Sequence, residues 1–147
     1  MSHSKLFNDT SGIKSTVVNI HQHNMNTALN IYKSWMGWLA KAKDFGKGRP
    51  DGKHGRIIAH GTEVHFKYHD TILCVLYPTG VIRIQNCGYK TATTKKRLNR
   101  ILNTYGYTIE QRKFVWWFSI VHPCTCCGNK VELPNAFMLQ LEPRAIQ

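Results

Sequence analysis

The chain has 147 residues, the size of one ordinary domain, and its 42% hydrophobic content is enough for a buried core, which excludes a wholly disordered chain. Its 20 Lys and Arg outnumber 8 Asp and Glu, for a net charge of +12, so we expect a polyanionic partner. No run approaches the ~20 apolar residues of a membrane span, and the polar N-terminus is unlike a signal peptide. We therefore expect a protein that stays in the cytoplasm and does not use a membrane.

Residues 1–20 mix Ser, Thr, Asn and Lys without a clear period, which predicts a flexible arm with one short strand at 16–20. From Asn24 the apolar residues recur at the spacing of one helix face. This pattern predicts an amphipathic helix over 24–43, capped by Asn24 or Asn26. Its aromatic stripe is interpreted as a core-facing surface in preference to a membrane or partner-helix face.

A basic, glycine-rich stretch follows at 44–56 and predicts an exposed loop, which either contacts phosphate or is a solvated linker. Short runs rich in Val, Ile, Phe, Tyr and Thr come next, separated by turn signals. Apolar residues on both faces of 71–77 place that run at the centre of a sheet. The predicted strands are 56–59, 63–68, 71–77, 81–86, 113–121, 131–133 and 137–141.

A second helix is predicted over 94–105, with an apolar face and Gly106 in the C-cap position. No acidic residue occurs between Thr71 and Ile109. A cap at Thr93 or Thr94 would place three cations in the first turn, where the helix macrodipole disfavours them. A bound anion would remove this conflict, so the pattern favours a phosphate site over a merely solvated basic face.

The candidate nucleic-acid-binding residues combine cations for phosphates, threonines at the helix start and one asparagine that could read base edges in a major groove. They are Arg83, Lys90, Thr93, Thr94, Lys95, Lys96, Arg97, Asn99 and Arg100, together with Lys47, Arg49 and Lys53 of the basic loop.

The cysteines do not resemble a secreted disulfide framework, because they are five in number and three lie together. Cys124 and Cys127 form one CxxC, which is half of a zinc-ribbon site. Cys126 and His122 are the nearest candidates for further ligands, and Cys87 and His60 are distant ones. Reduced turn cysteines are the alternative to zinc, and we favour them.

Histidines among the predicted strands raise the possibility of a metal-dependent nuclease. The candidates are His60, His65 and His69, with Glu63 and Asp70 nearby. No paired carboxylates or phosphate loop of known spacing accompany them. We therefore expect exposed or hydrogen-bonded histidines and a protein that is not an enzyme.

The segment from His60 to Leu139 resembles a group of short, uncharacterised proteins encoded by tailed bacteriophages. The resemblance rests on the turn Pro78-Thr79-Gly80, on the run Gly-aromatic-x-Thr-x-Thr-Thr-Lys-x-Arg-x-Asn that begins at Gly88, and on Trp116 and Trp117 in a later strand. Tyr89 stands where a tryptophan is expected. The resemblance implies a phage source and a small β-rich fold with one packed helix, and it implies no activity.

Together these patterns predict one α+β domain, in which a small antiparallel sheet carries a long N-terminal amphipathic helix and a second, basic helix; the β-rich core spans 56–141. The leading functional hypothesis is a phage nucleic-acid-binding protein, with DNA favoured over RNA. The alternative is an inhibitor or modulator that docks its basic surface on an acidic host protein or defence complex. The metal-dependent nuclease is the third hypothesis.

Overall fold

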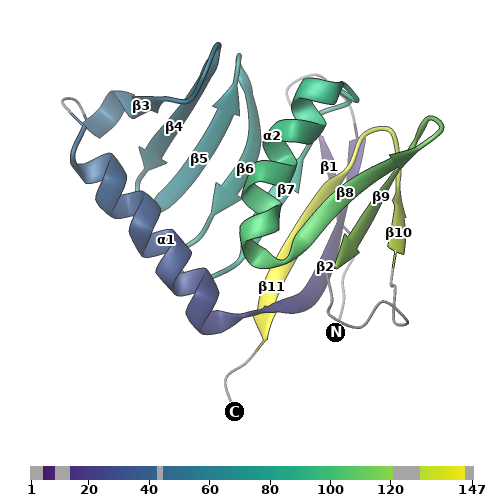
Figure 1. Cartoon of the computed structure of the whole chain (residues 1–147), viewed down its shortest axis with the longest axis horizontal. Coiled ribbons are helices and arrows are strands. Elements are labelled where there is room, and N and C mark those ends of the chain that lie inside the picture. Colours follow the sequence, from purple (N-terminus) through teal and green to yellow (C-terminus); the bar gives the residue numbers. More distant parts are fainter. Residues whose placement is uncertain (1–4, 9–13, 43–44, 121–129, 145–147) are drawn as a thin grey trace.

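Two β-sheets and two helices make up the computed structural model, which describes residues 5–8, 14–42, 45–120 and 130–144 (Figure 1). The helices are α1 (Met25–Ala40) and α2 (Ala92–Leu102), with short 3-10 turns at Phe45–Lys47 and Asn103–Tyr105. The strands are β1 (Lys5–Asn8), β2 (Lys14–Asn24), β3 (Arg49–Pro50), β4 (Gly55–His60), β5 (Glu63–Tyr68), β6 (Thr71–Leu76), β7 (Ile82–Gln85), β8 (Tyr107–Arg112), β9 (Val115–Ile120), β10 (Lys130–Leu133) and β11 (Met138–Arg144).

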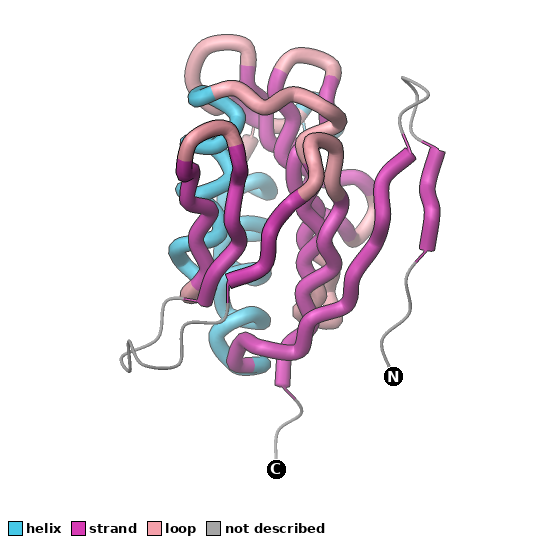
Figure 2. Tube along the Cα trace, turned by 90° about the vertical axis from the view of Figure 1, so that its right-hand side faces the viewer, coloured by secondary structure: helices cyan, strands magenta, loops and turns pink. Residues whose placement is uncertain are grey.

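The larger sheet has eight described strands in the order β1-β2-β11-β7-β6-β5-β4-β3. All neighbours are antiparallel except β2 and β11, which run parallel. The smaller sheet has the order β10-β9-β8. Both helices and the smaller sheet lie on the same face of the larger sheet, so that the core is enclosed between two layers (Figures 1 and 2).

The α+β prediction with a small antiparallel sheet is therefore wrong, because the described chain is mainly β and its larger sheet is mixed. The residues predicted as a flexible arm with one short strand at 16–20 contain β1 and most of β2. β2 joins the larger sheet by pairing with β11. Because β11 is distant in sequence, this pairing gives no local sequence signal. The predicted long helix is shorter than expected, since it ends at Ala40.

The central position of β6 is confirmed, with Cys74, Val75 and Leu76 all buried. One row of buried side chains crosses the sheet from Ile57 through Phe66, Cys74 and Ile84 to Leu139. On each strand, the residues before and after the member of this row point to the opposite face of the sheet, because side chains alternate along a strand.

Helix α1 begins at the cap Asn24, whose side chain accepts a hydrogen bond from the Thr27 amide at 3.1 Å. Its aromatic stripe packs on the sheet, with the Trp35 ring 5.1 Å from that of Phe66. Tyr107 and Phe118 of the smaller sheet complete the core. Among the described residues no helix has the length and apolar character needed to cross a bilayer.

Candidate nucleic-acid interface

Helix α2 begins earlier than predicted, because Thr91 is the N-cap. The Thr91 hydroxyl oxygen accepts from the Thr94 amide at 3.1 Å, and Thr94 is buried. The first turn therefore holds Lys95 alone among the cations, and Lys96 and Arg97 belong to the second turn. The macrodipole conflict is smaller than the sequence indicated, so the interface has to be judged from tertiary contacts.

Asp51 joins the turn between β3 and β4 to α2. Its carboxylate lies 3.3 Å from Nη1 of Arg97 and 2.5 Å from Nη2 of Arg100. Arg97 also donates to the backbone carbonyls of Asp51 at 3.1 Å and Lys53 at 3.0 Å. Because ion pairs with additional hydrogen bonds are geometrically specific, these contacts hold the basic loop against the helix.

Gly55 allows this close approach. A Cβ at this position would lie 2.2 Å from the Asp51 carbonyl oxygen and 2.4 Å from Nη1 of Arg97. This glycine of the basic loop is therefore needed for packing. From the sequence, the glycines of the loop indicated only that it is exposed.

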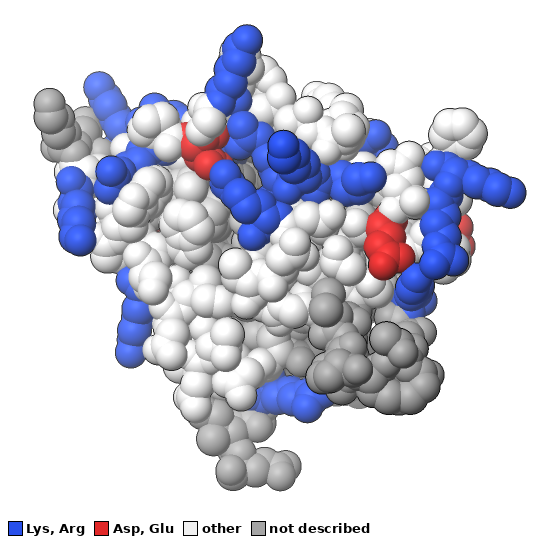
Figure 3. Space-filling view, viewed as in Figure 1, with Lys and Arg blue, Asp and Glu red and all other residues white. Residues whose placement is uncertain are grey.

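The basic face consists of Lys53, Lys96, Arg97 and Arg100. Lys53 and Lys96 are exposed, and the Arg100 side chain keeps 52% of its accessible surface. One carboxylate opposes two guanidinium groups, so this surface remains positively charged. Figure 3 shows Lys and Arg side chains gathered over the part of the molecule where α2 and the β3–β4 turn lie in Figure 1.

Lys95 and Lys90 lie beside the basic face, toward the smaller sheet. Lys95 donates to Oε1 of Gln111 at 3.1 Å. Lys90 donates to the Phe114 carbonyl and, at 3.2 Å, to Oδ1 of Asn135. Both lysines are half-buried, so they extend the positive field more than they offer free ammonium groups.

Asn99 bridges α2 and β8. Its Nδ2 donates to the Ile109 carbonyl at 2.9 Å, and its Oδ1 accepts from the Ile109 amide at 2.7 Å. Both ends of the amide are thus used within the fold, which is the arrangement of a structural residue. Thr93, by contrast, is exposed.

The other predicted site residues lie apart from the basic face. Arg49 contacts α1, where it donates to the Trp38 carbonyl at 3.1 Å and lies 4.3 Å from that ring's centroid. Arg83 lies between buried Ile82 and Ile84, so it points to the opposite face of the larger sheet. Lys47 is exposed in the 3-10 turn before β3.

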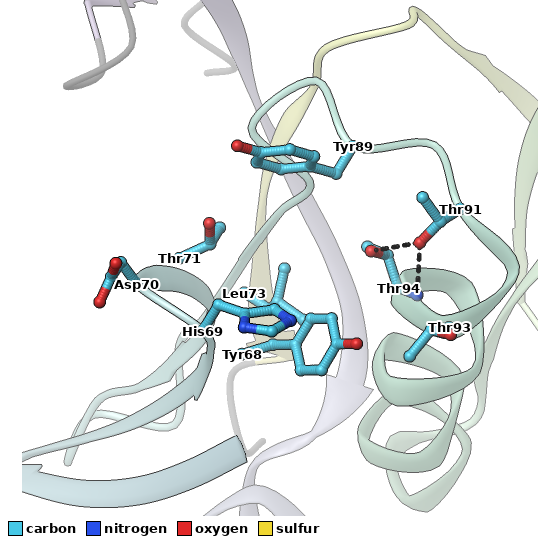
Figure 4. A pocket seen from close by; sticks show the side chains of 9 residues that line it. All are labelled: Tyr68, His69, Asp70, Thr71, Leu73, Tyr89, Thr91, Thr93 and Thr94. Atoms are coloured by element: carbon cyan, nitrogen blue, oxygen red, sulfur yellow. Dashed lines mark hydrogen bonds between the residues drawn. The ribbon is translucent and has the colours of Figure 1, made fainter. Parts of the chain in front are cut away.

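A pocket of about 440 Å³ opens at the start of α2. Tyr89 lies on one side of it, and Tyr68 and His69 lie on the opposite side (Figure 4). Thr91, Thr93 and Thr94 line the helix side. This pocket could not be predicted from local sequence patterns, because its walls come from the β5–β6 hairpin and from the distant segment that leads into α2.

The histidines separate into two groups. His65 Nε2 lies 2.8 Å from Glu63 Oε1, and the His60 ring stacks on His65 with centroids 5.0 Å apart. The ligand atoms of these three residues lie within 4.8 Å of one another, and two imidazoles with a carboxylate are a zinc-compatible set. His69 stacks instead on His54, beyond the other end of β5. Cys124, Cys126, Cys127 and His122 fall outside the described residues.

The fold and this surface define a small, mainly β protein with a basic face beside an aromatic pocket. The sequence profile of the family described as Kyanoviridae Gp96 protein matches residues 51–137, more than half of the chain. The chain therefore belongs to this family, and Kyanoviridae are phages, so the predicted phage origin is confirmed. No curated protein and no solved structure shows significant similarity to the chain.

Proposed function

We propose that this phage protein binds nucleic acid through the basic face, whose cations neutralise backbone phosphates. The observation that carries the proposal is the shared ion pair of Asp51 with Arg97 and Arg100. It fixes the loop bearing Lys53 against the helix bearing Lys96, so that cations from distant parts of the chain are collected before a ligand arrives. Preorganised charges lose less side-chain entropy on binding than free ones.

These side chains favour contact with the phosphate backbone of the nucleic acid over contact with its bases. Asn99, the residue predicted to read base edges, has both amide atoms bound to Ile109. The exposed groups of the basic face are cations, which bind phosphate without regard to sequence. We therefore expect affinity that depends weakly on sequence and strongly on salt.

The test is a fluorescence-anisotropy titration of labelled duplex DNA, single-stranded DNA and single-stranded RNA at several salt concentrations. If the three exposed cations of the basic face, Lys53, Lys96 and Arg100, contact phosphates, the slope of log K against log salt is about −2 to −3. Binding to any of these three nucleic acids, with a salt slope of that size, supports the proposal. Absence of binding to all of them at low salt overturns it.

A further inference from the structure

We infer that the pocket between Tyr89 and the pair Tyr68 and His69 holds one unpaired base of a single-stranded nucleic acid. The inference rests on the proposed function and adds to it a preference for single strands. The backbone of the bound strand lies on the basic face, and one base turns into the pocket.

The size and the walls of the pocket suit a nucleobase. Its volume of about 440 Å³ is within the range of small-ligand pockets, which begins near 300 Å³. Aromatic rings stand on two sides, and threonine hydroxyls line the third (Figure 4). Aromatic side chains bind bases by stacking regardless of base identity, because every base has a π face.

Tyr89 is exposed, and hydrogen bonds hold the backbone segment that carries it. It keeps 56% of its accessible surface, whereas most large apolar side chains of the described chain are covered. The segment before it is fixed by Asn86, which is buried and whose Oδ1 accepts from the amides of Gly88 at 3.2 Å and Phe137 at 3.0 Å. The Tyr89 amide donates to the Asn86 carbonyl at 2.9 Å. A rigid backbone thus presents the ring, which favours binding because little order is lost.

The pocket is continuous with the basic face through Tyr68. The guanidinium group of Arg97 lies 4.4 Å from the centroid of the Tyr68 ring, which also forms a wall of the pocket. Asp70, the acidic residue of the lining, turns its carboxylate away from the space between the rings (Figure 4). A phosphate next to the bound base therefore lies close to the cations of the basic face.

The pocket distinguishes single strands from duplexes. Bases in a duplex are paired and stacked, and extruding one costs a few kcal/mol. A strand with unpaired bases reaches the pocket without this cost. Duplex DNA is then limited to the basic face.

The experiment compares Tyr89→Ala with the wild type on three probes: a short oligothymidine, a strand of the same length built from abasic sites, and a duplex. Loss of one stacking contact weakens binding of oligothymidine by about tenfold. The abasic strand and the duplex change by less than about twofold, and Tyr89→Phe keeps the wild-type affinity, because stacking does not need the hydroxyl. Phe114→Ala is the matched control, since Phe114 is an aromatic side chain 87% exposed at the β8–β9 hairpin.

An unchanged affinity of Tyr89→Ala for oligothymidine, with a normal salt slope, overturns the pocket inference and leaves the proposed function standing. An equal loss on the abasic strand also overturns it, because the contact would then be to the backbone. Failure of the wild type to bind any probe overturns the proposed function itself. Thermal unfolding of each variant confirms that the exposed substitutions leave the fold intact.

Discussion

Arg97 lies 4.4 Å from the centroid of the Tyr68 ring while its guanidinium group also pairs with Asp51. One side chain therefore connects α2, the β3–β4 turn and the wall of the aromatic pocket. Only 16% of the Arg97 side-chain surface and 12% of that of Asp51 remain accessible, so the ion pair is largely shielded from water. Its removal should affect stability as well as binding.

Asp51→Asn should lower the free energy of unfolding by about 1–3 kcal/mol, because it leaves two guanidinium groups without their carboxylate in a partly buried site. Urea unfolding measures the effect. Asp70→Asn is the control, since Asp70 is exposed, and it should change stability by less than about 0.5 kcal/mol. Equal stability of the two variants would show that the ion pairs do not hold the loop.

Gly55→Ala should destabilise the protein by about 1–3 kcal/mol, because the added Cβ meets a backbone oxygen that cannot move easily. Gly37→Ala makes the same chemical change in the interior of α1, where a Cβ would have no neighbour within 4 Å. Higher helix propensity should there stabilise the protein by about 0.5–1 kcal/mol. Thermal unfolding should show shifts of opposite sign, and shifts of the same sign would contradict the packing at Gly55.

Asn99→Ala should cost about 1–3 kcal/mol of stability, since it leaves both the amide and the carbonyl of Ile109 without their partner. Asn103→Ala, at the exposed C-cap of α2, is the matched control and should cost much less. The sequence preference of Asn99→Ala and Asn103→Ala in the binding assay tests whether Asn99 has a structural role or reads bases. A change of sequence preference in folded Asn99→Ala would contradict the structural role.

His23 should make stability depend on pH. Its Nε2 donates to the Gly80 carbonyl at 2.8 Å, so Nδ1 accepts from the Tyr107 hydroxyl at 2.7 Å in the neutral ring. Burial lowers the pKa of His23 below its ordinary value of 6.5. Below that pH the unfolded chain binds a proton that the folded chain does not, so stability is lost as the pH falls from about 7 toward 5.

His23→Gln removes the titrating group, so its stability should fall less over that pH range than that of the wild type. Urea unfolding at about pH 7 and about pH 5.5 measures both slopes. Identical slopes in the two proteins would assign the pH dependence to other groups.

Local patterns predicted both helices and several individual strands, although the predicted fold class was wrong. β5 spans the predicted residues 63–68, and alternating apolar residues placed β6 at the centre of the sheet. β8 was missed, although Tyr107 and Ile109 are buried at alternate positions. The parallel pairing of β2 with β11 could not be predicted, because it joins segments from opposite ends of the chain and uses no turn.

The candidate site was predicted less completely, for the same reason. Thr91, Thr93 and Thr94 are chemically alike, so the sequence could not say which one caps α2. The partners of Arg97 and Asn99 come from β3–β4 and β8, which are separate from α2 in sequence. Tyr89 was visible as part of a motif, but its exposure depends on the contacts of Asn86.

The salt dependence of single-strand binding by Lys96→Ala, compared with Lys33→Ala, tests the central claim most directly. Both variants lose one exposed lysine, from α2 and from α1 respectively. If the basic face binds phosphates, Lys96→Ala reduces the slope of log K against log salt by about 1, and Lys33→Ala leaves it at the wild-type value. Equal slopes for the two variants, or no binding by the wild type at low salt, would contradict nucleic-acid binding through this face.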